Sequence, residues 1–287
     1  MKCLVTGSNG QLGFDIVREL VSRGINDVVA CDRNTFDITD RDSTAQFIVD
    51  EKPDVIFHCA AWTAVDKAEG MEDEVYKVNV EGTRNIVDAA RLCDSKIFYI
   101  STDYVFDGAK DGLYETDDIP NPMSVYGKTK YLGEEIVKEY SKSFIVRISW
   151  VFGINGNNFI KTMLKLSDIK DELNIVDDQV GSPTYTVDLA KLLVDMAETT
   201  KYGIYHATND GFCSWATLAE YIFKIIDKPI QVNKVSTEEY LELTGTKQAY
   251  RPRNSKLNKH SLDENGFEIL PDWKDATKRY IKELGKY

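Results

Sequence analysis

The chain has 287 residues and a formal net charge of −12 at pH 7, from 35 Lys and Arg against 47 Asp and Glu. This acidic balance argues against a general binder of nucleic acid or of anionic membranes, which needs a basic surface. Hydrophobic residues make up 43% of the chain, enough to fill a substantial core. No apolar run approaches the roughly 18 residues of a membrane span, and no signal-peptide pattern opens the chain. We therefore expect a cytoplasmic globular protein with neither nucleic acid nor membrane as partner.

The cysteines and histidines do not form a metal-binding pattern. The five cysteines are widely spaced, without a Cys-x-x-Cys pair, and several lie in apolar runs, which favours buried reduced thiols over disulfides. Three scattered histidines do not predict a zinc or iron site. The sequence therefore predicts no metal. These residues are Cys3, Cys31, Cys59, Cys93, Cys213, His58, His206 and His260.

The first half of the chain alternates apolar strand-like runs with helical patterns. The runs are rich in Val, Ile and Phe and lack polar alternation, which is typical of parallel strands covered on both faces. This order predicts an α/β fold with a doubly wound, Rossmann-like parallel sheet. The predicted strands are Lys2–Thr6, Asp27–Asp32, Asp54–Cys59, Lys96–Ser101 and Ser143–Ser149. The predicted helices are Gln11–Ser22, Asp42–Asp50, Glu72–Leu92 and Ser124–Ser141.

After about Trp150 the alternation loosens into helices joined by loops rich in Gly, Pro, Asn and Arg. We expect a dinucleotide-binding domain over residues 1–150. A smaller substrate-binding domain is expected over 151–287, with some of its segments returning to the first, and with the active site between the two. The predicted helices here are Asn157–Leu166, Val187–Thr199, Ser214–Ile226, Thr237–Leu243 and Trp273–Leu284.

Three glycines follow the first predicted strand in the pattern Gly7-x-x-Gly10-x-x-Gly13. A glycine turn at this place lets the backbone approach a pyrophosphate, which binds the exposed N–H groups of the following helix. Gly13 allows that helix to pack closely on the sheet. The pattern predicts a dinucleotide site, and the alternative is a tight strand-to-helix turn without a ligand.

Asp32 and Arg33 end the second predicted strand, 19 and 20 residues after Gly13. A carboxylate at this place can accept hydrogen bonds from the adenosine ribose hydroxyls and favours NADH. A guanidinium can instead pair with a 2′-phosphate and favours NADPH. We therefore expect either cofactor to be used.

Tyr126 and Lys130 stand four residues apart on a predicted helix, so their side chains share one face. With 15 Tyr in the chain, about one such pair is expected by chance, so the spacing alone has little weight. Its place after a strand that ends in Ser101-Thr102-Asp103 gives it meaning. An ammonium can lower the pKa of a phenol and make Tyr126 a proton donor to a carbonyl that Thr102 polarises.

Asn79 falls on the apolar face of the predicted helix Glu72–Leu92. A buried amide needs a hydrogen-bond partner. A structural hydrogen bond and a place in a proton relay are both open at this point.

Together these motifs resemble the extended short-chain dehydrogenase/reductases, and more narrowly the dTDP-4-dehydrorhamnose reductase family. The resemblance covers essentially the whole chain and rests on the order and spacing of several segments. They are Gly10-Gln11-Leu12-Gly13, residues 60–69 (AAWTAVDKAE), residues 101–108 (STDYVFDG), residues 126–130 (YGKTK), residues 147–153 (RISWVFG), residues 178–184 (DQVGSPT) and residues 251–255 (RPRNS).

This resemblance implies reduction of the 4-keto group of a dTDP-linked 4-keto-6-deoxyhexose by NADPH or NADH. Thr102, Tyr126 and Lys130 would form the catalytic triad, in which Tyr126 protonates the alkoxide and Lys130 also binds the nicotinamide ribose. The implied cofactor contacts are Gly7, Asn9, Gly10, Gln11, Leu12, Gly13, Asp32, Arg33, Asp37, Ile38, Ala60, Ala61, Thr63, Tyr126 and Lys130. The implied substrate contacts are Val65, Asp66, Thr102, Asp103, Tyr126, Trp150, Asn158 and Arg251.

The chain departs from the family pattern at a few positions. His58 and Trp62 stand where the family commonly has Asn and Tyr, and Arg253 adds a charge where a small residue is usual. Some bacterial relatives form dimers through magnesium, but Asp15 alone does not make up such a site, so a homodimer is left open without a metal.

Two other functions remain open. One is a sugar-nucleotide epimerase or dehydratase that retains NAD⁺. The dehydratases need an Asp-Glu pair after the threonine, whereas Asp103 is followed here by Tyr104. The other is a non-catalytic NADP-binding subunit like that of methionine adenosyltransferase, against which the intact triad counts.

Overall fold

The structure, a computed structural model, describes residues 1–285, so positions 286–287 of the predicted second domain lie outside the described residues. Within residues 1–285, six parallel strands form the central sheet in the order β10-β5-β4-β3-β1-β2. The predicted doubly wound α/β fold is confirmed. The strands are β1 (Cys3–Thr6), β2 (Val28–Cys31), β3 (Val55–His58), β4 (Lys96–Thr102), β5 (Ser143–Ile148) and β10 (Gly203–His206).

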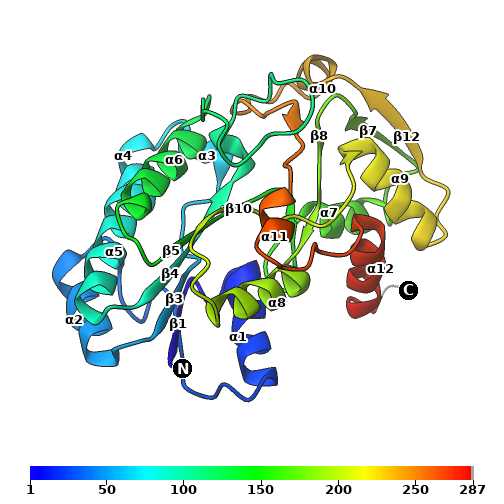
Figure 1. Ribbon diagram of the computed structural model, residues 1–287. Helices are drawn as coiled ribbons and strands as arrows, with labels where there is room; N and C mark the ends of the chain where they lie inside the picture. The colour runs from blue at the N-terminus through cyan, green and yellow to red at the C-terminus, as the bar shows by residue number, and fades with distance from the viewer. Residues whose placement is uncertain (286–287) are drawn as a thin grey trace.

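Helices cover both faces of this sheet (Figure 1). Side chains alternate along β1, so that Cys3 and Val5 pack into the core on one face and Leu4 into the core on the other. Helices α1 and α8 cover the first face, and α2, α5 and α6 cover the second. Burial on both faces explains why the strands lack polar alternation. The helices are α1 (Gln11–Ser22), α2 (Arg41–Glu51), α5 (Gly82–Cys93), α6 (Val125–Lys138) and α8 (Thr186–Ala197).

The sheet takes its edge strand β10 from the second half of the chain, where Gly203–His206 pairs with residues 144–147 of β5. Helix α8, which also follows residue 150, packs on α1. The N-terminal unit therefore includes segments from beyond the predicted boundary. The sequence pattern missed β10 because it begins with a glycine and has only two apolar residues, Ile204 and Tyr205, so it lacks the Val- and Ile-rich run of the other strands.

The predicted helix Glu72–Leu92 is not a regular α-helix. It contains α4 (Glu72–Tyr76), a π-helical turn over Lys77–Glu81 and α5. Asn79 lies in the π-helical turn and is 1% exposed. Single π-helical turns inside α-helices are frequent at functional sites. Hydrophobic periodicity does not report such a local change of hydrogen bonding.

The remaining chain forms a smaller unit at the carboxyl ends of the strands (Figure 1). Its apolar core joins residues of α7, α9 and α12. Its helices are α7 (Phe159–Leu166), α9 (Trp215–Ile225), α10 (Thr237–Thr244) and α12 (Trp273–Glu283). Its short strands pair as β6 (Val151–Phe152) with β9 (Thr184–Tyr185), β7 (Glu172–Val176) with β12 (Gln231–Val235), and β8 (Val180–Gly181) with both β11 (Cys213–Ser214) and β13 (Asn254–Ser255).

Short helices complete the connections, namely α3 (Val65–Ala68) and α11 (His260–Glu264). Among the residues that the structure describes, none of the helices has the length and apolarity to cross a membrane. Because the strands are parallel, the loops that follow β1, β2, β3 and β4 meet at one edge of the sheet, where ligands bind in folds of this kind.

Candidate active site

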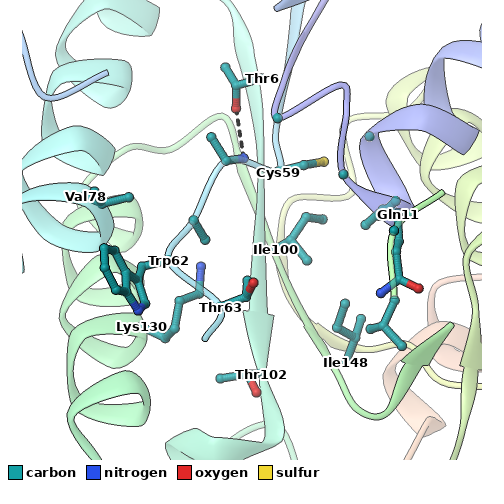
Figure 2. Close-up of a pocket in the computed structure, with 18 of the residues that line it drawn as sticks. Thr6, Gln11, Cys59, Trp62, Thr63, Val78, Ile100, Thr102, Lys130 and Ile148 are labelled. Carbon is teal, nitrogen blue, oxygen red and sulfur yellow. Dashed lines mark hydrogen bonds between the residues drawn. The ribbon is translucent and has the colours of Figure 1, made fainter. Parts of the chain in front are cut away.

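A cavity of about 690 Å³ lies at this edge, between the sheet and the smaller unit. In Figure 2, Trp62, Thr63 and Lys130 lie on one side of it and Gln11 and Ile148 on the other. It brings together nineteen residues that were predicted as cofactor, substrate or catalytic contacts. They are Gly7, Asn9, Gly10, Gln11, Leu12, Gly13, Asp32, Arg33, Asp37, Ile38, Ala60, Ala61, Thr63, Val65, Thr102, Asp103, Tyr126, Lys130 and Trp150.

The glycine turn after β1 is shaped so that side chains do not fit. Gly7 has φ of +65°, and a Cβ atom there would lie 2.8 Å from the backbone nitrogen of Ala60. A Cβ atom on Gly13 would lie 2.4 Å from the carbonyl oxygen of Gly7. Helix α1 begins directly after this turn, so its first backbone N–H groups lie at the cavity. The turn therefore fits a dinucleotide pyrophosphate.

The end of β2 provides the polar groups expected for an adenosine ribose. Asp32 accepts a hydrogen bond from the Asn9 side chain, with Nδ2 2.5 Å from Oδ2. Backbone N–H donors, that of Asn34 first, lower the pKa of Asp32, so it is a carboxylate at neutral pH. Arg33 is largely exposed and lies 3.9 Å from a carboxylate oxygen of Asp37. The structure thus places a hydrogen-bond acceptor, Asp32, and an exposed cation, Arg33, at the same rim of the cavity.

A buried chain of hydrogen bonds positions the loop after β3. Thr83 donates to the carbonyl oxygen of Asn79 at 2.7 Å, so its oxygen is left to accept from Nε2 of His58 at 3.1 Å. Nδ1 of His58 then accepts from Thr6 at 2.9 Å, and Thr6 accepts from the N–H of Ala60 at 3.1 Å. Burial lowers the pKa of His58 to about 3, so this ring is neutral. His58 is thus a structural residue behind the cavity wall.

Asn79 holds the other end of the same loop. Its side chain accepts from the N–H of Trp62 at 2.8 Å and donates to the carbonyl oxygen of Trp62 at 3.3 Å. It also donates to Thr129, the neighbour of Lys130, at 3.1 Å. Of the two interpretations left open for Asn79, these contacts support the structural one. The loop over residues 60–62 is therefore clamped from both sides.

Thr102, Tyr126 and Lys130 lie together on the cavity wall. Lys130 is 3% exposed, and its Nζ lies 4.0 Å from the centre of the Tyr99 ring. Burial lowers the pKa of Lys130 to about 7, although the Glu134 carboxylate opposes this shift. Burial raises the pKa of Tyr126, and a hydrogen bond with Thr102 only partly offsets it. The expected lowering of the phenol pKa by the Lys130 ammonium is therefore wrong for the ligand-free protein, because the pKa of Tyr126 shifts upward and burial is the main cause.

Asp103 extends this group with a buried carboxylate. It accepts hydrogen bonds from the hydroxyl of Thr102 at 3.0 Å and from that of Ser255 at 2.5 Å. Burial raises the pKa of Asp103 to about 6, against the effect of these two donors. Thr102 has a single hydroxyl proton, so it can donate to a bound carbonyl only after its hydrogen bond with Asp103 has broken.

Trp150 lies on the side of the smaller unit. It has φ of +49°, a conformation that is unfavourable for a bulky side chain. Its ring stacks on Trp215 with centroids 3.6 Å apart. Strained residues of this kind persist where the surrounding packing holds them, and they cluster at ligand sites. The structure presents Trp150 to the cavity as a fixed aromatic face.

Three predicted substrate contacts do not line the cavity. Arg251 donates to both carboxylate oxygens of Asp66, at 3.0 and 2.8 Å, and to the hydroxyl of Tyr104 at 3.0 Å. Asn158 caps α7 and donates to Gln11 and to the hydroxyl of Tyr280. Their side chains are engaged within the protein in this ligand-free state. Arg251 and Asp66 still contact residues at the rim, whereas Asn158 has a structural position.

Several residues that were not predicted as cofactor, substrate or catalytic contacts also line the cavity. Many of them lie at the carboxyl ends of strands or in the loops that follow, so their place in the chain was the available signal. They are Thr6, Cys31, Phe36, Cys59, Trp62, Val78, Ile100, Ser101, Tyr104, Ile148, Ser149, Val151, Gly156 and Asn157.

Across residues 1–285, no three His, Cys, Asp or Glu side chains are grouped so as to hold a metal ion. Asp15, mentioned above, instead bonds Thr186 and Arg18.

Comparison with known proteins agrees with this arrangement. The model of the RmlD substrate binding domain family matches residues 1–286. A dTDP-4-dehydrorhamnose reductase of Aggregatibacter actinomycetemcomitans is 42% identical, over 96% of this chain and 97% of that protein. A dTDP-4-keto-6-deoxy-D-glucose reductase of Streptomyces niveus is 36% identical, over 95% and 94%. The crystal structure of a dTDP-4-dehydrorhamnose reductase of Bacillus anthracis in complex with NADP superposes with a TM-score of 0.94, at 40% identity over 99% and 100% of the two chains. Because the family model matches residues 1–286 and these relatives are similar over nearly their full length, the chain belongs to the RmlD substrate binding domain family.

Proposed function

We propose that this protein reduces the 4-keto group of dTDP-4-dehydro-L-rhamnose to give dTDP-L-rhamnose, with NADPH or NADH as the reductant. One observation carries the proposal: the glycine turn and the group Thr102, Tyr126 and Lys130 line a single cavity. That arrangement places a dinucleotide site next to a proton donor. The names and cofactor of the relatives support the same activity.

The reduced nicotinamide supplies the hydride when it is bound. Tyr126 supplies the proton that the new alkoxide needs, and Thr102 orients the carbonyl by turning its hydroxyl from Asp103 toward it. Lys130 has a pKa of about 7 in the ligand-free protein because it is buried. The negative charge of a bound dinucleotide favours its protonated form. The charged ammonium then stabilises the tyrosinate that remains after proton transfer.

The smaller unit supplies the sugar-nucleotide side of the site. Trp150 offers an aromatic face to the sugar ring. Arg251 is the cation for the diphosphate, which it reaches by exchanging the carboxylate of Asp66 for phosphate oxygens. We propose on this basis that residues 151–287 form mainly the substrate-binding part, in a cytoplasmic enzyme that can form a homodimer.

Three alternatives can be distinguished from this function. A dehydratase is disfavoured because Tyr104 follows Asp103 where the second acid is needed. A reductase for another 4-keto sugar nucleotide is the stronger competitor, since a relative that is 36% identical carries such a name. A non-catalytic subunit would bind NADPH without consuming it.

The decisive experiment couples the protein to a dehydratase and an epimerase, starting from dTDP-glucose, and identifies the product by NMR. We expect stoichiometric consumption of NADPH and formation of dTDP-L-rhamnose. A different C4 epimer identifies another reductase. Binding of NADPH without turnover of any keto sugar nucleotide contradicts the enzymatic function.

A further inference from the structure

The carboxylate of Asp103 joins the catalytic strand to a segment from the other end of the chain. Asp103 is 3% exposed and follows β4, whereas Ser255 is 2% exposed and lies on β13. Strand β13 is held by parallel pairing with β8, where Ser255 lies opposite Gly181. The hydroxyl of Ser255 is therefore carried to Asp103 by the backbone of the smaller unit. Asp103 lines the cavity and Ser255 lies behind it.

The direction of the hydrogen bonds follows from counting protons. An ionised carboxylate only accepts, so both Thr102 and Ser255 donate to it. A hydroxyl has one proton, so Thr102 cannot donate to Asp103 and to a substrate carbonyl at the same time. The backbone N–H of Tyr104 occupies a further lone pair of Thr102, at 3.2 Å. Donation by Thr102 to a substrate carbonyl therefore requires its hydrogen bond with Asp103 to break, an exchange that leaves this carboxylate oxygen free to accept a sugar hydroxyl.

We propose that Ser255 is a positioning residue that keeps the Asp103 carboxylate ionised and in place during this exchange, an inference that rests on the proposed reductase function. Ser255 is the donor that does not face the ligand, so its hydrogen bond persists while the other is exchanged. A protonated Asp103 would donate from one of its oxygens and would be a weaker acceptor for the sugar hydroxyl that replaces Thr102. Activity then depends on the ionised form.

Ser255 is the main group around Asp103 that favours its charged form against burial. The titratable groups that face it are the phenols of Tyr104, in the 3-10 turn Asp103–Val105, and of Tyr126, on α6. Arg251 lies beyond Tyr104 and donates a hydrogen bond to the Tyr104 hydroxyl. Burial raises the pKa of Asp103, and several hydrogen bonds lower it. The Ser255 hydroxyl has the largest lowering effect, and the Thr102 hydroxyl has the next largest.

The test compares the pH dependence of kcat/KM for wild type and Ser255→Ala between pH 5 and 9, with the keto sugar nucleotide and NADPH. The acid limb of kcat/KM reports ionisations of the free enzyme. Loss of a hydrogen bond to a charged group should move this limb upward by about one to two pH units. At pH 9 the variant should approach the wild-type value. Ser255→Cys keeps a weak donor, so its limb should lie between the two.

The matched control is Ser182→Ala, which removes another fully buried serine hydroxyl of the same unit, one that donates to the carbonyl oxygen of Gly211 at 2.7 Å. Its acid limb should not move. A second control is Asp103→Asn, in which adding Ser255→Ala should change kcat/KM less than twofold. An equal loss for Ser182→Ala and Ser255→Ala at every pH would overturn the proposal, because it would show a structural effect alone.

A measurement without turnover separates this inference from the proposed function. The carboxyl carbon of Asp103 can be followed by NMR in protein labelled with ¹³C-aspartate, with the signal assigned by its loss in Asp103→Asn. We expect its titration midpoint to rise in Ser255→Ala and to stay constant in Ser182→Ala. A midpoint that does not rise overturns the role of Ser255 whatever the activity. A midpoint that rises in a protein without reductase activity supports the role and contradicts the proposed function.

Discussion

Burial of a charged lysine in the active site should lower the stability of the ligand-free protein, so Lys130→Met should stabilise it. Burial lowers the pKa of Lys130 from 10.5 to about 7. In the window between these values the unfolded chain holds a proton that the folded protein lacks, so wild-type stability rises with pH. Below about pH 7 Lys130 is charged in the folded protein, so the full cost of burying its ammonium lowers the stability. A pKa shift of this size corresponds to a loss of stability of at most about 5 kcal/mol. Relaxation around the site should reduce the stability that Lys130→Met gains to about 1–3 kcal/mol.

The measurement is urea unfolding of cofactor-free wild type and Lys130→Met at several values between pH 6 and 10. The gain of the variant should be constant below pH 7 and should shrink above it, by at most a little over 1 kcal/mol per pH unit. Lys128→Met is the control, because Lys128 lies on the same helix and is exposed. It should change the free energy of unfolding by less than about 0.5 kcal/mol. A Lys130→Met protein less stable than wild type at pH 7, or a gain that does not vary up to pH 10, would refute the reasoning.

Three further predictions concern the cavity. Tyr126→Phe should lower kcat by about 10²–10⁴-fold in single-turnover hydride transfer while NADPH still binds, and near-normal transfer would exclude Tyr126 as the acid. Arg33→Ala should weaken NADPH by about 1–3 kcal/mol in titration calorimetry and leave NADH unchanged, whereas an equal loss for both cofactors contradicts its pairing with the 2′-phosphate. Gly7→Ala should raise the Kd for NADPH at least about tenfold, since its Cβ atom would lie 2.8 Å from the nitrogen of Ala60. Gly24→Ala, at φ of +76° with nothing within 4 Å, carries the same backbone strain and should leave the Kd unchanged.

Much of the cavity could be predicted because its residues follow strands directly. In a parallel sheet, the positions after consecutive strands meet at one edge, so the glycine turn, Asp32 and Thr102 are brought together by the order of elements alone. The helical spacing of Tyr126 and Lys130 puts both side chains on one face. The order of the motifs was sufficient to predict these cavity residues because each motif is a short continuous segment of the chain. The division at residue 150 stays a prediction, and the structure adds that β10 and α8 cross it.

Other features depend on contacts between distant segments. The π-helical turn around Asn79 arises where a side chain binds the backbone of Trp62, and no periodicity in the sequence reports that contact. The neutral state of His58 and the engagement of Arg251 with Asp66 likewise follow from neighbours that are far away in the chain.

Local patterns in the chain were enough to predict five strands of the parallel sheet, the glycine turn and the common location of Thr102, Tyr126 and Lys130, because backbone geometry and strand order place neighbouring motifs with little freedom. The chemical state of the site was decided only by tertiary packing. Burial lowers the pKa of Lys130 and raises the pKa of Tyr126, the opposite of the change expected for the phenol from helical spacing. The partner of Asp103 comes from a strand 152 residues away. The free energy of a charge depends on its surroundings in three dimensions, and distant parts of the chain supply those surroundings.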